Sequence, residues 1–164
     1  MRFRASVILL GLIISISGNA EETHKGKVVG VEALSQGLRD LLTQEMRELE
    51  KGMMSIIPAY ISGDWAQIET TAGKMQRSYI LKQSLSESQV KELQTLLPHD
   101  FISSDQRFHY LAGMLEHAAK SKKPELINFY FSEMNESCAS CHAQHATHRF
   151  PALGTVGEQD EHSH

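Results

Sequence analysis

The chain has 164 residues, of which 41% are hydrophobic and 22% are charged, and its formal net charge is −4. This length suffices for one domain with a buried core. Acidic residues outnumber basic ones by 20 to 16, so the composition argues against the basic face that nucleic-acid binding requires, and we expect no nucleic-acid partner.

Residues 1–20 have the pattern of a secretory signal. Arg2 and Arg4 form a short basic region, and an apolar run follows over residues 5–17. The run is shorter than the roughly 20 residues of a membrane span. We expect cleavage after Ala20, with retention as an N-terminal anchor as the alternative. Cleavage predicts a periplasmic protein without a membrane span, carrying 14 basic and 20 acidic residues.

The first element after the signal is a predicted amphipathic helix that begins near Val28. Its apolar residues recur at steps of three and four, which is the helical period; they are Leu34, Leu38, Leu42, Met46, Leu49, Met53 and Ile56. Pro58 is expected to kink the helix or to mark its last turn. Gly63 suits the left-handed position that ends a helix, and Asp64 suits the N-cap of the next one.

Further helices follow in the remaining chain, because caps, prolines and apolar spacing divide it into helical segments. They are expected over residues 65–83, over 86–97, from Ser103 or Ser104 to 120, and over 124–148, with residues 98–101 as a connection. We therefore predict an all-α fold over residues 21–150. Four long helices with short connections favour an antiparallel four-helix bundle with a short extra helix between the second and third. Residues 151–164 are expected to be a disordered tail.

The last long helix carries Cys138, Cys141 and His142, which together form the C-x-x-C-H pattern of covalent c-type haem attachment. Residues three apart on a helix share one face, so both thiols can reach the two vinyl groups of one porphyrin. A neutral imidazole at the next position can bind the iron as its proximal ligand. The pattern predicts one covalently bound haem c.

Three other interpretations of the two cysteines are open. A thioredoxin-like dithiol belongs at the start of a helix that follows a strand, and no strand pattern precedes Cys138. A zinc site usually has four ligands, which His145 and His148 would complete only awkwardly from the same helix end. A disulfide across two intervening residues is geometrically tight. The export signal favours the haem interpretation.

An exported chain with its haem motif on the last of four helices resembles the class II cytochromes c, the family of cytochrome c′ and its low-spin relatives. The resemblance covers nearly the whole mature chain. It is specific at Cys138–His142 and at a first-helix segment in which Met46 stands seven residues before the Met53–Met54 pair. The resemblance implies that Met46 binds the iron opposite His142. A core methionine is the alternative interpretation.

Two features bear on how far the resemblance extends. Family members often have a Tyr-Arg or similar pair three and four residues after the haem histidine, where this chain has His145 and Ala146. This departure counts against a gas-binding role. Arg39 lies two turns before Met46 on the same face, so it is a candidate for a haem propionate contact, with a solvated surface arginine as the alternative.

The function expected from these features is electron transfer by a monohaem cytochrome, without independent enzymatic activity. The expected partners are redox proteins, and a homodimer is consistent with the family. The alternative is a cytochrome c′-like protein that binds or scavenges NO or CO at an open sixth position. A third hypothesis makes the chain a subunit or electron donor of a larger oxidoreductase, with its acidic charge steering it to a basic patch.

Overall fold

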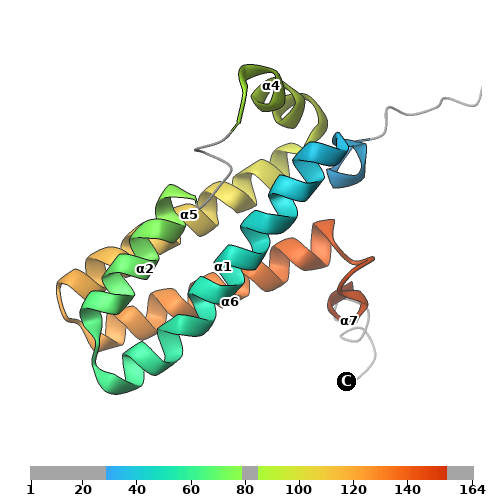
Figure 1. Ribbon diagram of the computed structural model, residues 1–164. Coiled ribbons are helices and arrows are strands. Elements are labelled where there is room, and N and C mark those ends of the chain that lie inside the picture. The colour runs from blue at the N-terminus through green and yellow to red at the C-terminus, as the bar shows by residue number, and fades with distance from the viewer. Residues whose placement is uncertain (1–28, 79–84, 155–164) are drawn as a thin grey trace, which may run out of the picture.

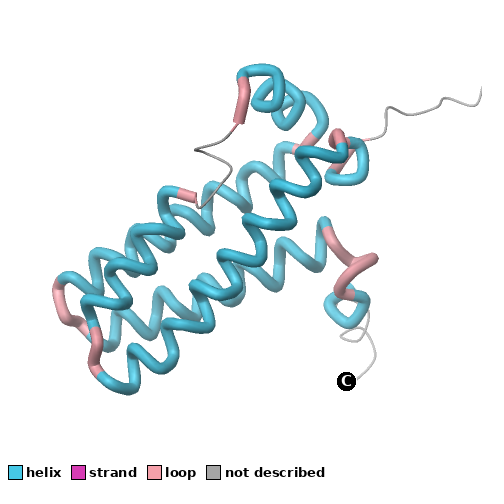
Figure 2. Tube along the Cα trace, viewed as in Figure 1, coloured by secondary structure: helices cyan, strands magenta, loops and turns pink. Residues whose placement is uncertain are grey.

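A computed structural model describes residues 29–78 and 85–154, and every regular element in these two ranges is a helix. The prediction of an all-α fold is therefore confirmed for this part of the chain (Figures 1 and 2). The elements are a 3-10 turn, η1, and six α-helices; their bounds are η1 Val31–Ala33, α1 Gln36–Ser62, α2 Trp65–Arg77, α4 Glu87–Leu96, α5 His99–Lys120, α6 Pro124–His145 and α7 Pro151–Gly154. The proposed signal at residues 1–20 lies outside the described residues.

The four long helices run back and forth along the molecule. Backbone contacts are most extensive between α2 and α5, followed by those between α5 and α6 and between α1 and α2. The turns after α1 and after α5 lie at one end, and the start of α1, the start of α5 and the end of α6 lie at the other (Figure 1). We call the second of these the motif end, because it carries Cys138, Cys141 and His142.

The buried side chains form two clusters. The main core takes apolar residues from α1, α2, α5 and α6, among them Leu49, Ile68, Leu115 and Met134. A smaller core at the motif end is centred on the first turns of α1 and is covered by residues of α4 and the start of α5; its buried members are Leu34, Leu38 and Leu42. A backbone hydrogen bond of 2.7 Å from Gly30 to the carbonyl of Leu96 also ties the segment before α1 to α4.

Local signals placed several helix ends correctly. Gly63 has φ 71° at the end of α1, and the Asp64 side chain accepts a 3.0 Å hydrogen bond from the Gln67 N–H at the start of α2. Ser86 and Gln89 form a capping box at the start of α4. Pro124 is the first residue of α6. Helix α1 continues through Pro58 for one further turn.

Four predicted boundaries were wrong. The first helix begins at Gln36 rather than near Val28, because residues 31–33 form a 3-10 turn and Leu34 is extended. The second ends at Arg77 instead of residue 83, because Ser78 adopts φ 63°; residues 79–83 of that prediction lie outside the described residues. Residues 99–101 belong to α5, with Pro98 preceding it, rather than to a connection. The last long helix ends three residues early, at His145.

The expected tail at residues 151–164 begins with the short helix α7, Pro151–Gly154. The remainder of that tail lies outside the described residues. Within the described ranges, no helix is both long enough and apolar enough to cross a membrane.

Candidate haem-attachment site

The three motif residues occupy the last two turns of α6. Cys138 and Cys141 are both half-buried and form no disulfide. Because they stand one helical turn apart, their thiols lie on the same side of the helix. Cys138 packs against the main core. The Cys138 thiol therefore lies at the core-facing edge of α6.

Burial holds both thiols in their protonated form. Burial raises the pKa of the Cys138 thiol from 9.0 to about 11, and the neighbouring Cys141 adds to this rise. Burial also raises the pKa of the Cys141 thiol, and the carboxylates of Asp105 and Asp100 on α5 raise it further. These thiols therefore do not resemble a reactive redox dithiol, whose nucleophilic cysteine has a lowered pKa.

His142 is half-buried beside Cys141, and its pKa is lowered, first by burial and then by the positive charge of Arg149. Its ring stacks on that of Phe150, with centroids 4.3 Å apart and planes 6° from parallel. Stacking covers one face of the imidazole. A metal binds a ring nitrogen in the plane of the ring, so the stacking does not occupy the position that a metal would take. The arrangement favours a neutral imidazole, which is the form that ligates iron.

Met46 lies on α1 and is half-buried at the boundary of the two clusters. It packs against both the main core and the smaller core at the motif end. Cys138 packs against the same main core from α6. The fold therefore brings Met46 and the haem motif to a shared core, although they are more than 90 residues apart in the sequence.

Arg39 lies on α1 near its start, where it makes only local hydrogen bonds among those described. Its guanidinium donates to the carbonyl of Leu34 at 2.6 Å, to the carbonyl of Glu32 at 3.2 Å and to the side chain of Gln36 at 2.6 Å. These bonds connect η1 to the first turn of α1. A contact between Arg39 and a propionate stays a prediction.

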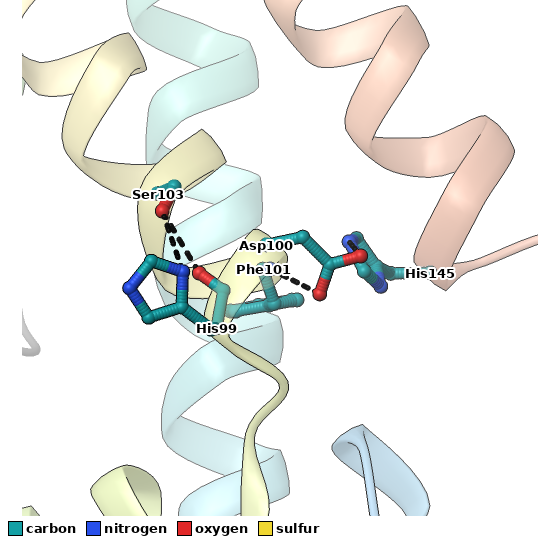
Figure 3. A network of polar contacts seen from close by, with 5 residues as sticks. All are labelled: His99, Asp100, Phe101, Ser103 and His145. Atoms are coloured by element: carbon teal, nitrogen blue, oxygen red, sulfur yellow. Dashed lines mark hydrogen bonds and ion pairs between the residues drawn. The ribbon is translucent and has the colours of Figure 1, made fainter.

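His145 lies one turn beyond His142 and joins the end of α6 to the start of α5 (Figure 3). Its ring packs edge-on against Phe101, with centroids 5.2 Å apart. Its Nε2 is 3.9 Å from a carboxylate oxygen of Asp100, beyond hydrogen-bond distance. Among the described residues, this buried nitrogen has no hydrogen-bond partner. It borders a cavity of about 210 Å³ that Glu32 and His148 also line.

A buried polar network is the part of this region that the sequence patterns did not reveal. The Glu45 side chain is only 1% exposed and accepts a 2.9 Å hydrogen bond from the hydroxyl of Ser78. One signal was present: Glu45 falls on the apolar stripe between Leu42 and Leu49, where a charged residue requires a buried partner. That partner is 33 residues away in the sequence, so no local pattern identifies it.

No protein-family model, curated protein or solved structure matches the chain in comparisons with known proteins. Across residues 29–78 and 85–154, no three His, Cys, Asp or Glu side chains are grouped so as to hold a bare metal ion.

Proposed function

We propose that the chain is an exported monohaem c-type cytochrome that transfers electrons between redox proteins in the periplasm. Cys138 and Cys141 would hold the haem through two thioether bonds. His142 would be the proximal iron ligand and Met46 the distal one. The bound haem supplies a one-electron couple. The observation that carries the proposal is the C-x-x-C-H motif on one helix, with both thiols half-buried and in no disulfide, and with Cys138 packed against a core that Met46 also borders.

The residues of the motif end fit such a group in three respects. The thiols share one side of α6, as attachment to a single porphyrin requires. Burial and Arg149 favour the neutral form of His142. The buried Nε2 of His145 has no hydrogen-bond partner among the described residues, and the carboxylate of a propionate is one group that could supply it.

We further propose that α1, α2, α5 and α6 form an antiparallel four-helix bundle, with α4 as the short extra helix. Two helices would then hold the iron between them, α1 through Met46 and α6 through His142. Met46 on α1 and Cys138 on α6 both pack against the main core.

Ligation of the iron by two side chains of the protein, His142 and Met46, would favour electron transfer over gas binding. A thioether and an imidazole are both neutral, and a thioether ligand raises the reduction potential of a haem. If both positions are occupied, the iron changes oxidation state without gaining or losing a ligand. Such a site needs no pocket for a substrate.

The test is the optical spectrum of the purified, reduced protein with and without carbon monoxide. Ligation by His142 and Met46 predicts narrow α and β bands that carbon monoxide leaves unchanged. A broad high-spin spectrum that shifts on addition of carbon monoxide would contradict ligation by Met46 and would favour the gas-binding alternative.

A further inference from the structure

The buried network around His109 connects three helices. His109 on α5 is 6% exposed, and its Nδ1 lies 2.6 Å from the carbonyl oxygen of Met75 on α2. Its Nε2 lies 3.4 Å from a carboxylate oxygen of Asp105. The N–H of Ser78 donates to the same Met75 carbonyl at 3.2 Å, and the Ser78 hydroxyl donates to Glu45 on α1. The network thus runs from α5 through the end of α2 to α1.

The two ends of this network lie beside the two halves of the proposed haem site. At one end, Asp105 is close enough to Cys141 for its charge to act on that thiol. At the other end, Glu45 directly precedes Met46 in α1. A change of charge at the iron would therefore be felt by the polar groups between these ends, since charges interact strongly in a poorly solvated interior.

The contacts of His109 suit an imidazole that gains and loses a proton. Both of its ring nitrogens face oxygen acceptors, the Met75 carbonyl and the Asp105 carboxylate. The imidazolium form donates from both nitrogens, whereas the neutral form must turn one lone pair toward an acceptor. The protonated ring can therefore donate toward both the Met75 carbonyl and the Asp105 carboxylate.

His109 also has access to solvent. It lines an open cavity of about 530 Å³ between α2 and α5, together with Gln76, Arg77, Gln106 and Tyr110. A proton can reach the imidazole through this cavity although most of the ring is buried.

The charged groups described near His109 come from α1, α2 and α5. Asp105 lies on α5 itself, and Glu45 on α1 is connected through Ser78. Arg77 on α2 lines the same cavity and lies 4.0 Å from Glu116 on α5, which offsets its charge. From α6, the adjoining core receives Met134 and Cys138, which are uncharged at neutral pH. Among these charged groups, Asp105 is the one that faces the His109 ring directly.

We propose that His109 is a proton-binding site coupled to the oxidation state of the haem, so that the protein takes up a proton with an electron. The proposal rests on the proposed function. When the haem iron accepts one electron from a redox partner protein, the charge at the iron falls by one. His109 then binds a proton from solvent more tightly and becomes an imidazolium, which donates to Met75 and Asp105. Oxidation reverses both changes.

The test is the reduction potential of the haem-bearing protein as a function of pH. The potential of the native protein should fall as the pH rises between about 5 and 8, where histidine changes charge. The His109→Asn variant retains a side-chain N–H for the Met75 carbonyl but cannot titrate, and it should lose most of this fall. His117→Gln is the matched control, because His117 is exposed on the same helix two turns further on, and it should retain the fall.

A fall of equal size in His109→Asn would overturn the proposal, as would a native potential that does not change with pH. If the variant fails to hold haem, the native protein labelled with ¹⁵N-histidine is titrated by NMR in both oxidation states. Several-fold tighter proton binding at His109 in the reduced form supports the proposal, and equal binding overturns it. A purified protein without covalent haem contradicts the proposed function itself, which its mass reveals before any titration.

Discussion

Met46 sits on the flank of the buried face of α1. Its neighbours Glu45 and Leu49 are 1% and 7% exposed and mark the centre of that face, whereas Met46 is half-buried. A residue on the flank can face a group held between α1 and another helix. A residue at the centre of the face is enclosed by the core.

Replacing Met46 with alanine removes the proposed distal ligand. We expect the reduced spectrum of Met46→Ala to change from narrow bands to a broad high-spin form that binds carbon monoxide. Met54→Ala is the matched control, because Met54 lies on the same helix and is 67% exposed, and it should leave the spectrum unchanged. Narrow bands that persist in Met46→Ala would show that another group binds the iron.

The Cys138 thiol gives a prediction for the haem-free chain, produced without export. Burial raises its pKa from 9.0 to about 11, so the folded state holds the thiol proton more tightly than the unfolded state does. Below pH 9 the Cys138 thiol is protonated in both the folded and the unfolded state, and its contribution to the free energy of unfolding is fully present. It is lost as the pH rises through about 11, since the unfolded chain ionises first.

Urea unfolding between pH 9 and about 11 should therefore give a free energy of unfolding that decreases as the pH rises. Cys138→Ser, which does not ionise in this range, should show a smaller decrease. Equal decreases in both chains would mean that the thiol is not protected from solvent.

At the scale of single elements, the accuracy of the sequence predictions depended on the range of the forces involved. The turn at Gly63 and Asp64 and the start of α4 at Ser86 were predicted correctly, because a cap is decided by a few neighbouring residues. The end of α2 was predicted wrongly, because Ser78 leaves the helix with φ 63° and its hydroxyl donates a hydrogen bond to the distant Glu45. The start of α5 was missed because Pro98 can precede a helix as well as end one.

The same distinction applies to the candidate site. Cys138, Cys141 and His142 are adjacent in the sequence, so their shared position on α6 was predictable from spacing alone. The position of Met46 at the same core followed from its place on the apolar stripe of the first helix, whereas its role as an iron ligand came from the family resemblance. Neither source revealed the contact of His109 with Met75 or the stacking of Phe150 on His142, because each depends on how separate segments fold together.

The turn between α1 and α2 offers a direct test of local backbone preference. Gly63 has φ 71°, a conformation that costs residues with a Cβ roughly 1–2 kcal/mol. Gly63→Ala should lower the free energy of unfolding by about that amount. Gly37→Ala is the control, because Gly37 is helical and exposed with nothing within 4 Å of an added Cβ, and it should raise stability slightly. Chemical denaturation of both variants measures the difference; equal effects would contradict a left-handed Gly63.

In the whole molecule, the last two turns of α6, with Cys138, Cys141 and His142, lie at one end of the long helices. The start of α1, the start of α5 and the end of α6 meet there (Figure 1). The whole chain carries a formal charge of −4, and an acidic protein is steered toward a basic surface on a partner. A haem attached through Cys138 and Cys141, in the last turns of α6, would lie within reach of such a partner.

The proposed function depends on covalent haem. The most direct measurement is the intact mass of the exported protein, made in a host that attaches haem c and denatured before analysis so that only covalent bonds survive. We predict a coloured protein whose mass exceeds that of the processed chain by one haem, with the excess lost in a Cys138→Ala, Cys141→Ala double variant. A colourless protein with the mass of the bare chain would contradict the account.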